Sequence, residues 1–208
     1  MLGNNSIAEI ENELPESTKL GLFSNLAKIS YKDFIYCINR SIEFASLEME
    51  SSADNYNTLS EDTLSDIMVG ILKGMSIGAT RETKHNGHCD IVIRHSKKEY
   101  LILIEAKKSN KGAKWIDSGF DQLNMRYSNP QKGRDYGIVL VYVTTQKVPY
   151  IMGEVEKYVK KNISYVSGSY EKCSLRADAF KVDSTSEKSS LLYKVRFAPV
   201  ALNHNPKD

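Results

Sequence analysis

Two consecutive segments, 88–94 and 100–107, place three charged residues where they could act together. Both segments are apolar and strand-like, and the short connection HSKKE joins them. If the turn is centred on the two lysines of HSKKE, the numbers of paired residues sum to 195, and Asp90 lies opposite Glu105. Because side chains alternate along a strand, Asp90, Glu105 and Lys107 project from the same face.

These residue types in this arrangement suit phosphodiester hydrolysis. Two neighbouring carboxylates repel each other and resist simultaneous ionisation unless a cation lies between them. Mg²⁺ is the natural occupant, because it prefers oxygen ligands and keeps bound waters. The ammonium of Lys107, two residues beyond Glu105, can position the attacking water or stabilise charge that develops on a phosphoryl oxygen.

The alternative is an ordinary salt-bridge cluster between two strands. Glu105 follows directly on the apolar run LILI, so the charges begin where the buried part of the sheet ends. A surface ion pair more often lies on an alternating polar face. The position therefore favours a functional site.

Two helices are expected before these strands. Apolar residues recur at intervals of three and four over 17–50 and again over 59–74, on either side of a polar break at 51–57. Ser30 and Asp33 resemble a capping box at the start of a helix. The helical pattern then gives way to the alternation of strands.

Three antiparallel strands are expected in succession. They cover 79–85, 88–94 and 100–107, and the turn-forming dipeptide Asn86-Gly87 separates the first two. The charged residues therefore belong to the second and third of these strands.

A helix over 114–127 is expected between the third strand and an apolar strand at 136–144. Such a crossover makes the two strands parallel in one mixed sheet. Trp115 and Phe120 are among the residues that this helix should turn inward, although Gly119 weakens the helical pattern. The order of elements is α-β-β-β-α-β.

The remaining chain predicts a helix over 148–161 and a C-terminal β-hairpin from the segments 172–182 and 191–202. The predicted fold class is α/β, with an α-β-β-β-α-β core and a mixed sheet. We expect an acidic helical extension at 1–57, packed on a domain at 58–208.

Charge is unevenly distributed along the 208 residues. The net charge is +2, but residues 1–66 carry 4 basic and 12 acidic side chains, and the other residues carry 24 and 14. The basic part could attract nucleic acid, although dispersed lysines also serve solubility.

The longest nearly apolar run has eight residues, which predicts no membrane span. An acidic N-terminus and three cysteines without a CxxC pair predict a cytoplasmic protein.

A family resemblance agrees with this interpretation. Asp90 lies in GHCDIVIR, and fourteen residues separate it from Glu105-Ala106-Lys107. This pattern resembles the PD-(D/E)xK nuclease superfamily, whose restriction-endonuclease-like core has the order α-β-β-β-α-β; Cys89 replaces the proline of the motif. The resemblance implies that Asp90, Glu105 and the Ala106 carbonyl hold Mg²⁺, for which Mn²⁺ can substitute. It also implies that Lys107 aligns the attacking water.

Glu61 matches a further feature of this family, a glutamate on the preceding helix that reaches the metal. It precedes Leu64 by three positions and Met68 by seven, so it lies on the inward face of its helix. The alternative is a capping box in the run TLSE, with Glu61 bonded to the backbone of Thr58. Both roles stay open.

Further residues could contact nucleic acid. Gln122 lies where some members, resembling RecB-type nucleases, carry Gln-x-x-x-Tyr, and here Arg126 stands at the tyrosine position as a candidate phosphate contact. Lys108, Lys111 and Lys114 lead from the site into the helix and could neutralise flanking phosphates. For both groups the alternative is a solvated surface.

We therefore predict a Mg²⁺-dependent nuclease that cleaves DNA, with RNA as the less favoured substrate. The N-terminal helices could mediate a homodimer or bind a partner subunit. By analogy with the family, restriction, phage defence, repair and mobile elements are the candidate roles. The alternative function is a non-cleaving subunit with the same fold that binds nucleic acid or a protein.

Overall fold

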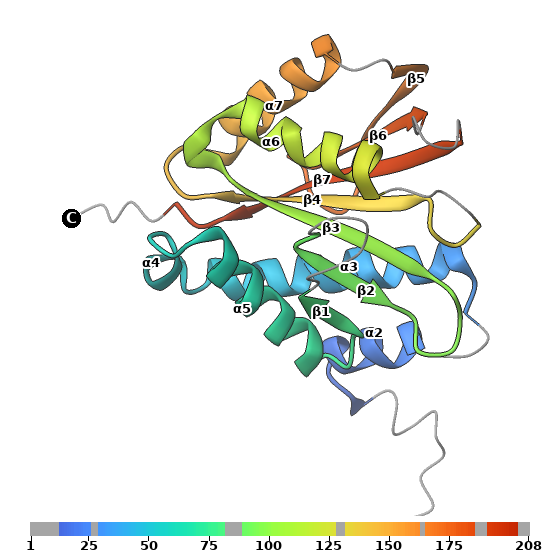
Figure 1. Cartoon of the computed structure of the whole chain (residues 1–208). Coiled ribbons are helices and arrows are strands. Elements are labelled where there is room, and N and C mark those ends of the chain that lie inside the picture. The colour runs from blue at the N-terminus through green and yellow to red at the C-terminus, as the bar shows by residue number, and fades with distance from the viewer. Residues whose placement is uncertain are drawn as a thin grey trace, which may run out of the picture.

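The computed structural model describes residues 13–25, 29–81, 89–127, 132–162, 165–185 and 191–203. These residues form an α/β fold in which one mixed sheet lies between two layers of helices (Figure 1).

The sheet combines parallel and antiparallel neighbours. Its strands in chain order are β1 (Ala79–Arg81), β2 (Ile91–Arg94), β3 (Leu101–Lys108), β4 (Tyr136–Val143), β5 (Tyr165–Lys172), β6 (Phe180–Thr185) and β7 (Leu192–Ala201). Across the sheet they are arranged β1-β2-β3-β4-β7-β6-β5. The pairs β3–β4 and β4–β7 are parallel, and the other neighbours are antiparallel.

Helices cover both faces of this sheet. The α-helices are α2 (Glu16–Asn25), α3 (Tyr31–Glu50), α4 (Ala53–Tyr56), α5 (Glu61–Gly74), α6 (Ala113–Asp121) and α7 (Val148–Asn162). A 3₁₀ turn, η1 (Ser109–Lys111), precedes α6, and a π-helical turn, η2 (Gln122–Tyr127), follows it. Helices α6 and α7 lie on one face of the sheet, and α3 and α5 lie on the other (Figure 1).

Alternation along β3 explains why both faces are covered. Ile102 and Ile104 belong to the apolar core beneath α3 and α5, whereas Leu103 belongs to the core beneath α6 and α7. Strand β4 is buried along its whole length, as predicted for a central strand. By the same alternation, Glu105 and Lys107 extend from the face that α6 covers.

Strands β2 and β3 pair in the predicted register. Ile91 lies opposite Ile104, as the sum of 195 requires, and Asp90 immediately precedes this pair. The predicted parallel pairing of β3 with β4 is also confirmed. Strand β1 pairs antiparallel with β2, while the predicted turn at Asn86-Gly87 lies outside the described residues.

The first helices agree with the prediction except at their boundaries. The predicted helical segment 17–50 contains two helices, α2 and α3. Ser30 and Asp33 form the expected capping box at the start of α3. Helix α5 starts at Glu61, two residues later than predicted, because the Ser60 hydroxyl caps its first turn.

The C-terminal strands differ from the prediction in their bounds, their place and their number. β6 and β7 form an antiparallel hairpin, but β6 covers Phe180–Thr185 and not the predicted 172–182, and β7 lies in the middle of the sheet beside β4. The hairpin therefore completes the central sheet. β5 was not predicted, because its sequence YVSGSYEK carries serines and a glycine and lacks an alternating apolar pattern.

A charged network fixes the N-terminal helix α3 to the sheet. Arg196 of β7 is fully buried, pairs with Glu43 and donates to Asn39 Oδ1 at 2.9 Å. Arg176 pairs with Glu50 at 2.6 Å. Because a buried charge without its partner is strongly destabilising, these pairs hold α3 in one position. Helix α3 shares its apolar core with α5 and the sheet, and the domain boundary predicted between them stays a prediction.

Candidate active site

Asp90 reaches across the end of the β2–β3 hairpin. Its Oδ2 accepts a hydrogen bond from the backbone N–H of Ala106 at 2.8 Å. This bond fixes the half-buried carboxylate of Asp90. The carboxylate of Glu105 lies close enough for the negative charge of Asp90 to raise its pKa. The register that the sequence predicts thus brings the two carboxylates together.

Glu105 and Lys107 form a buried ion pair on β3. Their side chains are 2% and 4% exposed, and Lys107 Nζ lies 3.1 Å from Glu105 Oε2. The second oxygen of Glu105, Oε1, is buried and has no hydrogen-bond partner among the described residues. This buried carboxylate oxygen is thus available to bind a ligand.

The pKa of Glu105 is raised to about 8. Burial is the largest cause, because it disfavours the charged form, and the negative charge of Asp90 acts in the same direction. Lys107 lowers the pKa in part through its charge and its hydrogen bond. One ammonium therefore does not fully compensate two neighbouring carboxylates.

A divalent cation fits this donor set. Glu105 Oε1 has no partner among the described residues, and a further positive charge would relieve the repulsion from Asp90. Asp90, Glu105 and the carbonyl of Ala106 are the groups that would hold Mg²⁺ or Mn²⁺, which need one or two carboxylates and keep waters. Among the described residues, no three His, Cys, Asp or Glu side chains gather closely enough to hold a metal ion.

Glu61 reaches the end of β3 from the first turn of α5. Its Oε2 accepts hydrogen bonds from the backbone N–H of Lys108 at 2.6 Å and from Trp115 Nε1 at 3.3 Å. The helix is capped by Ser60, so the predicted capping box with Thr58 is wrong. Glu61 lies beside the site, but it does not form a three-acid cluster with the two carboxylates.

The three lysines of the predicted basic run have different surroundings. Lys108 donates from Nζ to the carbonyl of Leu59 at 2.7 Å, so its ammonium is bound to the protein. Lys111 lies with its Nζ 4.1 Å from the ring centroid of Trp115. Lys114 is exposed. Only Lys111 and Lys114 have ammonium groups placed to meet a ligand from solvent.

Gln122 and Arg126 both lie in the π-helical turn η2 after α6. Gln122 is partly buried, and its Oε1 has no hydrogen-bond partner among the described residues. The side chain of Arg126 lies outside the part of the chain that the structure describes. Their predicted contacts with nucleic acid stay predictions.

Gly119 has a role that the sequence did not indicate. A Cβ at this position would stand 3.2 Å from both Cγ and Cε of Lys107 and 3.4 Å from Cγ1 of Val139. The missing side chain lets α6 approach β3 closely and leaves room for the lysine stem. A glycine inside an amphipathic helix that follows the lysine strand is the available signal.

Gly119→Ala is expected to lower the free energy of unfolding by about 1 kcal/mol. An alanine at an open helix position stabilises by roughly 0.5–1 kcal/mol, but overpacking against Lys107 costs roughly 1–3 kcal/mol. Gly70→Ala in α5 is the matched control, since its Cβ would meet nothing within 4 Å, and it should stabilise the fold. Denaturant unfolding measures both. Equal stabilisation by the two substitutions would contradict the close contact with Lys107.

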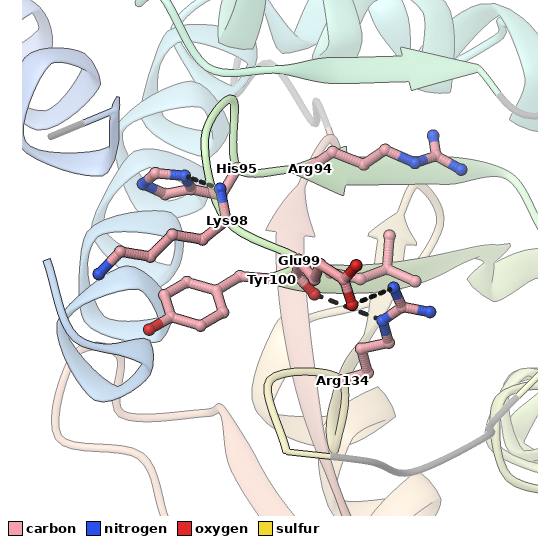
Figure 2. Close-up of a pocket in the computed structure, with 7 residues that line it drawn as sticks. Arg94, His95, Lys98, Glu99, Tyr100 and Arg134 are labelled. Carbon is pink, nitrogen blue, oxygen red and sulfur yellow. Dashed lines mark hydrogen bonds and ion pairs between the residues drawn. The ribbon is translucent and has the colours of Figure 1, made fainter. Parts of the chain in front are cut away.

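A small cavity lies at the other end of the β2–β3 hairpin (Figure 2). His95 Nδ1 there accepts hydrogen bonds from the backbone N–H groups of Lys97 and Lys98, both at 3.0 Å. Arg134 pairs with Glu99 at 3.4 Å. These polar groups stabilise the turn that sets the register, at the opposite end of β3 from Glu105 and Lys107.

Comparison with protein-family models, curated proteins and solved structures finds no match for this chain. Among the described helices, none is long and apolar enough to cross a membrane. The site must therefore be interpreted from its own chemistry.

Proposed function

We propose that this protein is a divalent-metal-dependent nuclease that hydrolyses phosphodiester bonds. One observation carries the proposal: two carboxylates from paired strands meet beside a buried lysine, and one carboxylate oxygen has no partner among the described residues. An ordinary surface ion pair would be exposed and contribute little to stability. Burial of Glu105 and Lys107 raises the cost of keeping them charged, which favours a catalytic use.

Each residue has a distinct task in this mechanism. Asp90 and Glu105 would hold the cation, together with the carbonyl of Ala106. The cation, when bound, supplies positive charge to the phosphoryl oxygens and lowers the pKa of water. Lys107 orients the attacking water and stabilises the charge that develops on the phosphate, with greater effect because its surroundings exclude water.

The order of elements supports assignment to the PD-(D/E)xK superfamily. The run α5, β1, β2, β3, α6 and β4 matches the α-β-β-β-α-β order of that core. Asp90 stands immediately before β2, and Glu105 and Lys107 stand near the end of β3. We propose that a restriction-endonuclease-like topology brings the residues of the site together. We also propose that Glu61 positions the end of β3.

DNA is the proposed substrate, and RNA is the less favoured one. Residues 67–208, which carry the site, have a net charge of +10 and would attract a polyanion.

A homodimer or a partner subunit would use α3, where Tyr36 and Leu47 are 55% and 59% exposed. The cysteines Cys37, Cys89 and Cys173 are all free thiols, as in a protein of the reducing cytoplasm.

The decisive experiment is incubation of the purified protein with single-stranded, double-stranded and branched DNA and with RNA. Each substrate is tested in Mg²⁺, Mn²⁺ and EDTA. Metal-dependent cleavage that is lost in Glu105→Gln supports the proposal. Binding without cleavage in any metal would instead favour the non-cleaving alternative.

Lys114→Gln is expected to reduce the salt dependence of binding to double-stranded DNA. Each phosphate contact contributes roughly 0.9 to the slope of log K against log salt, so the slope should fall by about that amount. Lys108→Gln is the matched control, because its ammonium is bonded to the Leu59 carbonyl and should leave the slope unchanged. Filter binding at several salt concentrations measures the slope. Equal slopes for Lys114→Gln and the parent protein would assign Lys114 to solubility.

A further inference from the structure

Trp115, the only tryptophan of the chain, stands outside both apolar cores. Phe120 is buried beneath α6, as predicted, but the prediction that Trp115 also points inward is wrong: Ile116 takes the inward position, and Trp115 is only partly buried. Successive residues of a helix point about 100° apart, so Trp115 cannot share the inward direction of Ile116. A large aromatic side chain left at the surface is a candidate for contact with a ligand.

The indole of Trp115 is held at a fixed distance from the proposed site. Its Nε1–H donates to Glu61 Oε2 at 3.3 Å, and the same oxygen accepts from the backbone N–H of Lys108 at 2.6 Å. Glu61 thereby joins α5, the end of β3 and the first turn of α6. The orientation of the ring is therefore coupled to the strand that carries Lys107.

Two lysines, one buried and one exposed, contact the ring of Trp115. Lys107 Nζ lies 4.9 Å from the ring centroid and is buried, whereas Lys111 Nζ lies at 4.1 Å and belongs to an exposed residue. A cation over an aromatic ring at an exposed position is weakly held. A flat ligand can therefore displace Lys111 from Trp115, and its ammonium is then free to meet a phosphate.

We propose that Trp115 is a stacking platform for an unpaired nucleobase beside the cleavage site. The proposal deepens the proposed nuclease function and rests on it for the identity of the ligand. Bases within a duplex are stacked on both faces, so only a single strand or an opened end can offer a base to this ring. The site therefore takes single-stranded nucleic acid in preference to an intact duplex.

The distances place the stacked base next to the reacting phosphate. The ring centroid is 4.9 Å from the ammonium of Lys107, so a base on Trp115 would belong to a nucleotide next to a phosphate that Lys107 contacts. Stacking on an aromatic side chain is tolerant of sequence, because every base has a π-face. The platform would therefore orient the strand without selecting a base.

A fluorescence titration tests the platform directly. Because the chain has one tryptophan, its emission reports on this ring alone. Oligothymidylate added to the full-length protein in EDTA should quench the emission in a saturable manner, and a blunt duplex should quench it much less. No quenching by oligothymidylate at concentrations where it binds would overturn the proposal.

Three variants separate stacking from structure, with binding to a labelled oligothymidylate measured by fluorescence polarisation. Trp115→Ala should weaken binding on the order of tenfold, while Trp115→Phe, which keeps a ring but loses the bond to Glu61, should weaken it less. Tyr150→Ala removes an aromatic side chain that is 60% exposed on α7, and should change nothing. Unchanged binding by Trp115→Ala would overturn the platform.

Cleavage of the same oligonucleotides in Mg²⁺ is measured separately. Quenching by oligothymidylate, together with weaker binding by Trp115→Ala, supports the stacking platform even if the protein does not cleave. In that case only the proposed nuclease function is wrong. Cleavage of duplex DNA combined with parental binding by Trp115→Ala supports the nuclease and overturns the platform.

Discussion

Asp90→Asn is expected to abolish both Mg²⁺ binding and cleavage, whereas Lys107→Met is expected to abolish cleavage alone. The Asn side chain removes a charge that would bind the cation, and it also relieves the repulsion that raises the pKa of Glu105, so the fold should survive. Met keeps the length of Lys107 but removes the ammonium that positions water. Turnover should then fall by an amount on the order of 10² or more.

Calorimetric titration with Mg²⁺ beside a cleavage assay separates the two roles. Lys160→Met is the matched control, since it breaks another Lys–Glu pair, with Glu156 at 2.6 Å on α7, and should alter neither measurement. Circular dichroism confirms that the variants are folded. Parental cleavage by both Asp90→Asn and Lys107→Met would show that the cluster is an ordinary strand-end ion pair.

The register of the site could be predicted from sequence because burial specifies it. A slip of one residue between β2 and β3 would turn the side chains of one strand to the other face, so Ile91 and Ile104 would no longer share one core. The apolar strand β4 was predictable for the same reason. Strand β5 was not, because its sequence lacks an alternating apolar pattern, and only its pairing with β6 identifies it as a strand.

The carboxylates could be predicted from the sequence, but their supporting contacts could not. The partners of Glu61 are a backbone N–H at Lys108 and an indole at Trp115, and no local pattern specifies contacts so distant along the chain. Gly119 weakens the predicted helix when only local propensity is considered. The need for a glycine at position 119 becomes visible only in the structure, where α6 packs on Lys107.

Glu105→Gln is expected to stabilise the metal-free protein at alkaline pH. In the folded state the pKa of Glu105 is about 8, against an ordinary value of 4.5, so folding favours the protonated form. The stability that this preference contributes is complete below about pH 4.5, declines as pH rises and is lost above about pH 8. At about 1.4 kcal/mol per pH unit the decline amounts to roughly 3–5 kcal/mol. Gln does not titrate, so the variant lacks this decline.

Denaturant unfolding in EDTA at pH 5, 7 and about 9 tests the sign, because the advantage of Glu105→Gln should grow across this range. Addition of Mg²⁺ near pH 8 should stabilise the parent protein, since a cation that binds only the folded state shifts the equilibrium, and should leave the variant unchanged. Parallel pH profiles for the two proteins would show that Glu105 is ionised at neutral pH in the folded protein. In that case Lys107 alone would compensate the charge of Glu105, and the electrostatic argument for a bound cation would be lost.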